Sequence, residues 1–132
     1  MKLNKKQKKI NKKSRHMLTK AYANKIIKKH NKEQLKLWSI EVRNEANNVC
    51  SFCNKAGLLH SHHVLPKETY KEFKFDIING VCLCPLHHKF GKLSAHKNTI
   101  WFSVWLQEKH PEKYAWVILK LKEEEDKNGM QS

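Results

Sequence analysis

The stretch between residues 48 and 98 decides the fold. It reads NVCSFCNKAGLLHSHHVLPKETYKEFKFDIINGVCLCPLHHKFGKLSAHKN, and it holds all four cysteines and six of the nine histidines of the 132-residue chain. A chain of this size supports one modest core and gains stability from a bound metal. In a reducing compartment, closely spaced Cys and His indicate metal binding rather than disulfides. We therefore expect this stretch to fold around metal.

Two pairs of ligands with the same spacing predict a structural zinc site. Two residues separate Cys50 from Cys53, and two separate Cys84 from His87. Such a spacer lets a tight turn place both ligands on one ion, and four ligands complete the tetrahedron of a structural zinc site. We assign the remaining thiol, Cys82, to the core as a small apolar side chain. The alternative is that Cys82 takes the corner assigned to His87.

Two short strands are expected within this stretch. Residues 58–66 include apolar and β-branched residues and end in a proline, and residues 80–84 are followed by Pro85. Residues 86–90 have the composition of a helix start, and Gly91 is expected to bend or end that helix. The stretch therefore predicts two strands followed by a helix.

Helices are expected on both sides of the metal-rich stretch. Residues 33–47 carry a broad apolar stripe that includes Trp38, and residues 99–110 and 114–122 carry further stripes. We expect the tryptophans and phenylalanines of these stripes to lie in the core rather than to stack on nucleic-acid bases. The predicted fold class is α+β.

Positive charge is concentrated at the N-terminus. Residues 1–32 contain 13 of the 27 Lys and Arg and no acidic residue, whereas the other 100 residues are nearly balanced. Such a block is expected to be extended or partly helical, and its natural partner is a polyphosphate. Nucleic acid, most simply double-stranded DNA, is therefore the expected partner. A ribosome-like or solubilising tail is the alternative, and membrane binding is disfavoured because apolar residues are few.

The predicted organisation has three parts. Residues 1–32 form a flexible or helical nucleic-acid-binding arm, residues 33–122 form the metal-bearing domain, and residues 123–132 form a polar tail. Neither a secretion signal nor an apolar run long enough to span a membrane is visible, so we expect a cytoplasmic protein located at the nucleic acid.

Three motifs in this stretch resemble the signature of HNH endonucleases. They are His62-His63-Val64-Leu65-Pro66, Asn79-Gly80-Val81-Cys82-Leu83-Cys84 and His87-His88-Lys89. The resemblance covers about residues 48–97 and implies a ββα-metal (His-Me finger) core that holds one divalent ion between a strand and a helix. It also suggests a phage or prophage member, located in the nucleoid or an infected host cytoplasm.

The resemblance implies a role for each matching residue. His63 would be the general base, His62 and His88 metal ligands, and Asn79 the residue that orients the loop. The chemistry supports these residue types, because phosphodiester hydrolysis needs a base active near neutral pH and a cation that neutralises developing charge. Consecutive His62 and His63 on a strand face opposite sides, which suits a division between ligand and base.

The third ligand of the catalytic ion is left open between two histidines. His96 is the first choice, although a continuous helix would place it about 12 Å from His88, so the helix must break between them. His60 shares a strand face with His62 and is the other candidate. Lys89 or Lys92 is expected to clamp phosphate.

The predicted function is therefore metal-dependent DNA hydrolysis. The cofactors expected are a structural Zn²⁺ and one catalytic divalent ion, either Mg²⁺, Mn²⁺ or another transition metal. One alternative is a non-catalytic zinc-ribbon module that binds nucleic acid, which would have no use for the surplus histidines. Another is an HNH-like component of a phage DNA-processing or recombination assembly, active only with a protein partner.

Overall fold

The computed structural model describes residue 2, residues 4–9 and residues 19–129. The chain divides into two units, residues 1–36 and 37–132, and each is considered by itself. The arm predicted over residues 1–32 lies partly outside the described residues, as do the last three residues of the predicted tail. None of the described helices combines the length and apolar character that a membrane span requires.

Residues 20–36 of the first unit are helical and basic. They form the start of helix α2 (Lys20–Glu45), where the Thr19 hydroxyl accepts a hydrogen bond from the Tyr22 amide at 3.3 Å. Five exposed lysines recur at the spacing of one helical face: Lys25, Lys28, Lys29, Lys32 and Lys36. Their ammonium groups face solvent, where a phosphate backbone can approach them.

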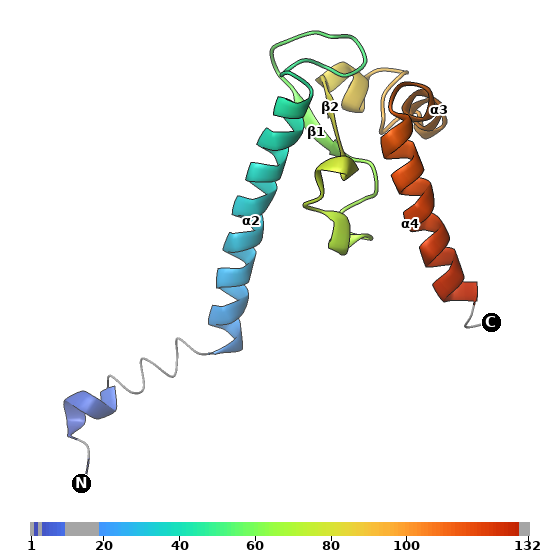
Figure 1. Cartoon of the computed structure of the whole chain (residues 1–132). Coiled ribbons are helices and arrows are strands. Elements are labelled where there is room, and N and C mark those ends of the chain that lie inside the picture. Colours follow the sequence, from blue (N-terminus) through green and yellow to red (C-terminus); the bar gives the residue numbers. More distant parts are fainter. Residues whose placement is uncertain (1, 3, 10–18, 130–132) are drawn as a thin grey trace. The chain divides into compact units, whose positions relative to one another are not determined.

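A two-stranded antiparallel sheet forms the centre of the second unit (Figure 1). Strand β1 (His60–His63) pairs with β2 (Gly80–Leu83), so that His62 lies opposite Val81 and His63 opposite Gly80. Both predicted strands are confirmed, and both are shorter than predicted because only four residues of each pair across the sheet. The α+β class is confirmed as well.

The two faces of the sheet pack against different helices. On one face, Cys82 of β2 packs with Trp38 and Val42 from the C-terminal half of α2. On the other face, Val81 and Leu83 pack against helix α3 (Thr99–Lys109). Cys82 is 1% exposed, so its predicted place in the core is confirmed. Neighbouring residues of β1, such as His62 and His63, accordingly point to different faces of the sheet.

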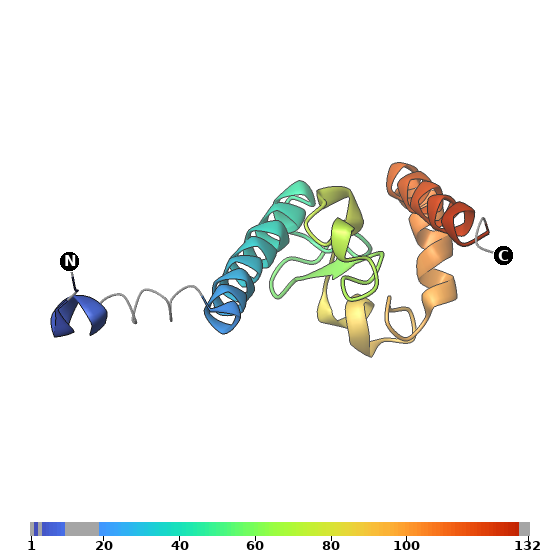
Figure 2. The same ribbon diagram turned by 90° about the horizontal axis from the view of Figure 1, so that it is seen from below.

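Helices α3 and α4 (Pro111–Gly129) lie side by side at the C-terminal end of this unit (Figure 2). Phe102 and Trp105 of α3 are buried, which confirms their predicted role in the core. The predicted end of the last helix at residue 122 is wrong. The acidic residues that follow remain helical through Gly129, because a run of Glu and Lys has good helix propensity.

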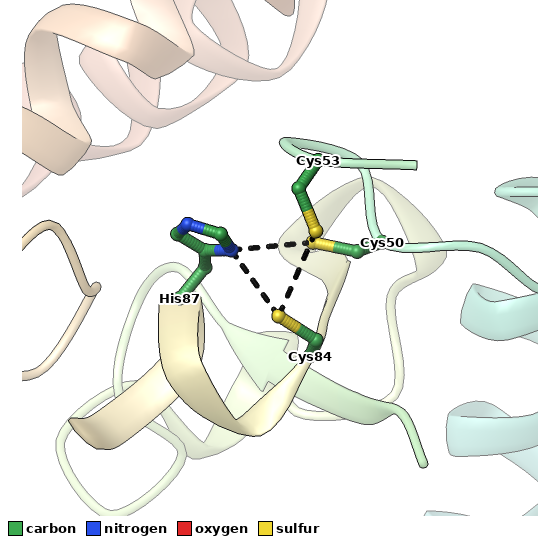
Figure 3. Close-up of side chains that lie close together, drawn as sticks. All are labelled: Cys50, Cys53, Cys84 and His87. Atoms are coloured by element: carbon green, nitrogen blue, oxygen red, sulfur yellow. Dashed lines mark hydrogen bonds between the residues drawn. The ribbon is translucent and has the colours of Figure 1, made fainter. Parts of the chain in front are cut away.

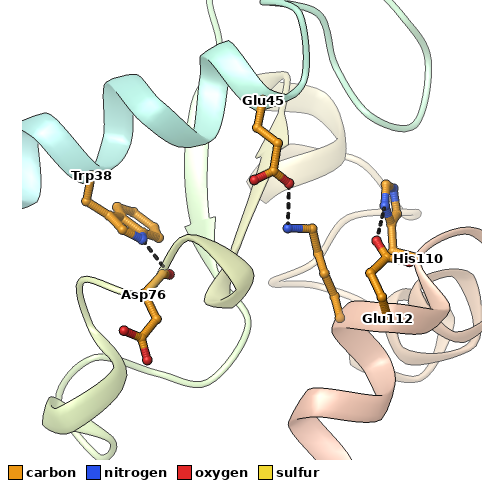
Figure 4. Close-up of polar contacts among 6 residues, drawn as sticks. Trp38, Glu45, Asp76, His110 and Glu112 are labelled. Carbon is orange, nitrogen blue, oxygen red and sulfur yellow. Dashed lines mark hydrogen bonds and ion pairs between the residues drawn. The ribbon is translucent and has the colours of Figure 1, made fainter.

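Polar contacts connect α2 to other parts of the unit (Figure 4). The buried Lys113 ammonium of α4 donates to Glu45 at the end of α2 over 2.9 Å, and the Trp38 indole N–H donates to the Asp76 carbonyl over 2.8 Å. The Trp38 bond holds the loop between the strands against α2. This loop carries the carbonyl that contacts His63.

Candidate functional site

Three thiols and an imidazole converge on one point (Figure 3). The ligand atoms of Cys50, Cys53, Cys84 and His87 all lie within 4.8 Å of one another. The Cys53 and Cys84 sulfurs are 3.8 Å apart, and Nδ1 of His87 is 3.2 Å from the Cys84 sulfur and 4.0 Å from the Cys50 sulfur. Zinc–sulfur bonds of about 2.3 Å place two tetrahedral sulfurs about 3.8 Å apart. The four residues could therefore hold a metal ion, and their arrangement is compatible with a structural zinc.

Local backbone structure brings these ligands together. Cys50 and Cys53 lie in a tight turn, where the Asn54 amide donates to the Cys50 carbonyl over 2.8 Å and Asn54 has a φ of 62°. Cys84 directly follows β2, and His87 lies in the π-helical segment η3 (Leu86–Phe90). Four side chains from two segments thus meet at one corner of the sheet.

The Cys50 thiol of this cluster differs from that of Cys82, whereas burial raises the pKa of Cys53 as it raises that of Cys82. Burial raises the pKa of Cys50, but backbone hydrogen bonds from Cys53, Cys84 and Phe52 outweigh it and lower the pKa overall. For Cys82, burial and then the neighbouring Cys50 raise the pKa to about 11. Zinc binds the thiolate, which the surroundings of Cys50 favour. Cys82 packs with Trp38 and Val42 instead, and His87 lies with the other three candidate ligands.

A second cluster consists only of histidines. Ring nitrogens of His62, His88 and His96 lie within 4.8 Å of one another. Nε2 of His88 is 3.2 Å from Nδ1 of His62 and 3.0 Å from Nε2 of His96. Metal–nitrogen bonds of about 2.0–2.1 Å place neighbouring ligand nitrogens roughly 3 Å apart. The spacing of these three imidazoles therefore fits a single metal ion, and the described part of the chain would fill three positions of its coordination sphere.

The π-helical segment explains how His96 reaches His88. The Gly91 amide donates to the Leu86 carbonyl over 2.7 Å and ends the helix, after which the chain turns back. The His96 amide then donates to the His88 carbonyl over 3.1 Å, and the buried Ser94 hydroxyl accepts from the Lys97 amide over 3.2 Å. The helix break that His96 needs to act as a third ligand is thus present.

Burial keeps two imidazoles of this cluster in the neutral form that can bind a cation. It lowers the pKa of His62 to about 3, with further contributions from His88, His96 and His63. It also lowers the pKa of His88 to about 4, with further contributions from His96, His60 and Lys89. Both imidazoles are therefore neutral at neutral pH, which is the form that binds metal.

His63 faces the opposite side of β1 and is held in one orientation. Its ring stacks on that of Trp38 with centroids 3.8 Å apart and 9° between the planes. Its Nε2 lies 2.8 Å from the Lys74 carbonyl. A carbonyl can only accept, so Nε2 carries the proton, and Nδ1 of the neutral ring keeps its lone pair. Burial and then Lys67 lower the pKa of His63, which favours this neutral form against the opposing effects of Lys74 and Glu68.

Asn79 is fully buried and holds the loop between the strands. Its Oδ1 accepts from the Leu65 amide over 2.7 Å, and its Nδ2 donates to the Leu65 and Phe73 carbonyls over 3.1 and 3.2 Å. These bonds hold the backbone at Leu65, two residues after His63, and at Phe73, next to the Lys74 carbonyl that His63 contacts. All three of these contacts of the Asn79 side chain are with backbone groups.

His63 and the cluster of His62, His88 and His96 line the same cleft, which we call the histidine cleft. It has a volume of about 350 Å³ and is lined by Ser61, His62, His63, Pro66, Lys67, Glu68, His88, Lys89 and His96. Of the two predicted phosphate clamps, Lys89 is in this lining and Lys92 is not. Sequence reasoning missed Lys67 and Glu68, because nothing in the composition of a loop indicates which side chains turn toward a site.

An apolar pocket of about 430 Å³ adjoins the histidine cleft. The two cavities share His62, His63, Pro66 and His96, and residues of α3 and α4 complete the wall of the pocket. The Phe102 ring lies 5.2 Å from that of His62. Apolar side chains therefore surround His62 on this side, which accounts for the burial that lowers its pKa.

His60, the other candidate for third ligand, lies on a different side of His88. Its Nδ1 is 2.9 Å from Nδ1 of His88, whereas His62 and His96 approach Nε2. The structure thus places His96 with the other two candidate ligands and His60 behind His88.

Comparison of the chain with protein-family models, with curated proteins and with solved structures gave no match.

Proposed function

We propose that the chain is a metal-dependent nuclease, and more particularly an endonuclease of the HNH class that hydrolyses phosphodiester bonds in DNA. The observation that carries this proposal is the relation between His63 and the histidine cluster. One cleft contains a neutral imidazole with a free nitrogen and three convergent metal-binding nitrogens. The ββα-metal core of the proposal consists of β1, β2 and η3, with Zn²⁺ bound by the cysteine-containing cluster in a structural role.

The chain's own residues have distinct parts in the proposed reaction. Lys67 and Lys89 bind the phosphate in the cleft, and His63 accepts a proton from the attacking water at Nδ1. The water oxygen bonds to phosphorus, the bond to the 3′-oxygen breaks, and solvent protonates that oxygen, which leaves 5′-phosphate and 3′-hydroxyl ends. The Lys74 carbonyl stabilises the protonated imidazole through its Nε2–H.

His62, His88 and His96 would hold the catalytic divalent ion. When bound, such an ion neutralises the charge that develops on the phosphoryl and leaving oxygens. The three imidazoles and the absence of any carboxylate from this cluster, among the described residues, favour a transition metal over Mg²⁺.

The lysine face of α2 supports nucleic acid as the substrate. Its five exposed lysines fit a phosphate backbone irrespective of sequence. This surface supplies affinity, whereas the cleft supplies the reaction. Such a protein is expected to work in the cytoplasm, at the nucleoid or on phage DNA.

The test compares zinc-loaded wild type with His63→Phe, which keeps a ring against Trp38 but removes the base. Supercoiled plasmid is incubated with each protein and with Mg²⁺, Mn²⁺, Co²⁺ or Ni²⁺. We expect nicking by wild type and a loss of about 10²- to 10⁴-fold in the variant, which is the usual contribution of a general base. The control is His30→Phe, an exposed histidine of α2 outside the cleft.

Two results would contradict the proposal. Equal activity of wild type and His63→Phe rejects His63 as the base. Binding of DNA by wild type without cleavage under any of the four ions rejects the nuclease and favours the non-catalytic nucleic-acid-binding module. Zinc content and melting temperature, measured on each protein, separate loss of the base from loss of the fold.

A further inference from the structure

Both ring nitrogens of His88 have a histidine partner. Nε2 faces His62 and His96 at 3.2 and 3.0 Å, and Nδ1 faces Nδ1 of His60 at 2.9 Å. The His60 and His88 rings meet edge to face, with centroids 5.0 Å apart. His88 is only 8% exposed, so its contacts are mainly with protein. His60 has no part in the reaction described above.

We infer that His60 is a positioning residue that holds His88 as a metal ligand through Nε2. This inference rests on the proposed catalytic metal site. If Nε2 gives its lone pair to the ion, the proton of the neutral His88 ring must lie on Nδ1. Nδ1–H then donates to Nδ1 of His60, which as the acceptor carries no proton on that nitrogen. One hydrogen bond thereby sets the tautomer and orientation of His88.

Strand β1 carries both His62, a candidate metal ligand, and His60, the positioning residue. His60 and His62 are two residues apart, so their side chains share one face of the strand, where both contact His88 of η3. His88 contacts His60 through Nδ1 and His62 through Nε2. The order of the two histidines on β1 therefore decides which one meets the ion.

The chemical nature of the acceptor is unusual for such a contact. A metal-ligating histidine generally donates its second N–H to a carboxylate, a backbone carbonyl or water. Here the acceptor is an imidazole and not a carboxylate, so no negative charge is added behind the ligand. A bound ion would therefore keep more of its positive charge for the phosphate.

The test separates the acceptor from the ring. His60→Phe keeps an aromatic ring of similar shape without an acceptor, and His60→Asn keeps an acceptor near the position of Nδ1. Zinc-loaded protein is titrated with Ni²⁺ by calorimetry, which requires no enzymatic activity. We expect His60→Phe to weaken Ni²⁺ binding by about 10- to 100-fold, as is usual for loss of such a partner, and His60→Asn to lie within a few-fold of wild type.

A matched control and a spectroscopic readout accompany the titration. The control is His110→Phe, which changes a half-buried histidine whose contacts are with Trp105 and Glu112. Nitrogen-15 NMR of the wild type reports the tautomer of His88, for which we expect protonation at Nδ1. Zinc content and melting temperature show that each variant is folded.

Three results would overturn the inference. They are Ni²⁺ binding by His60→Phe with wild-type affinity, protonation of wild-type His88 at Nε2 when the second ion is absent, and direct coupling of His60 to bound ¹¹³Cd, which would make it a ligand. Failure of the proposed function looks different. In that case wild type binds no ion beyond its zinc, or binds it and cleaves nothing.

Discussion

Replacing Asn79 by alanine tests how much the loop between the strands depends on one side chain. The amide makes three hydrogen bonds to backbone groups and is completely buried. Each such bond contributes about 1 kcal/mol net, and a buried partner left unsatisfied adds a penalty of about 1–3 kcal/mol. The Leu65 amide is one such partner, since Leu65 is 4% exposed. We expect Asn79→Ala to lower the free energy of unfolding by about 4 kcal/mol.

Urea unfolding of the zinc-loaded protein, followed by circular dichroism, measures this change. The matched control is Asn98→Ala, which removes an asparagine whose Oδ1 caps α3 by accepting from the Trp101 amide over 3.0 Å. Loss of a helix cap costs about 1 kcal/mol. If Asn79→Ala costs no more than Asn98→Ala, the buried amide does not hold the loop, and the argument that it supports the His63 contact fails.

Three further predictions concern packing, metal and pH. Gly80→Ala should cost about 1–3 kcal/mol in a melting experiment, because a Cβ there would lie 2.8 Å from Cζ2 of Trp38; an unchanged melting temperature would contradict this packing. Cys53→Ser should reduce bound zinc and the melting temperature together, whereas full zinc content by elemental analysis would exclude Cys53 as a ligand. In zinc-loaded protein without a second ion, the free energy of unfolding should fall as the pH is lowered from 6.5 to 5. The unfolded chain takes up protons at the ordinary histidine pKa, while folded His62 and His88 stay neutral down to about 3 and about 4. Each contributes at most about 2 kcal/mol at pH 5, and a profile no steeper than that of the double glutamine variant would refute this.

The cysteine-containing cluster and the strands were accessible to sequence reasoning because their signals are local. Two-residue spacers fix the distance between Cys50 and Cys53 and between Cys84 and His87, whatever the surrounding fold. Alternation along a strand likewise separates the environments of His62 and His63. These features follow from short-range geometry, and the structure places them as expected.

The remaining features depend on contacts between distant segments. A regular helix would carry His96 away from His88, and the turn of the chain after the helix end at Gly91 returns it. The carbonyl of Lys74 orients His63 by its position in a folded loop, since every residue has a carbonyl. The sequence favoured His96 as the third ligand and kept His60 as the alternative, and the two nitrogens of His88 distinguish them only in three dimensions.

Anomalous diffraction from crystals of zinc-loaded protein soaked in Mn²⁺ tests the two metal centres most directly. Data at the zinc edge should show one peak among the three sulfurs and Nδ1 of His87. A second, separate peak, visible in the manganese signal, should lie between His62, His88 and His96, with Nδ1 of His63 free in the same cleft. A single peak at the cysteine-containing cluster, with no ion at the three histidines, would contradict the catalytic site proposed for this chain.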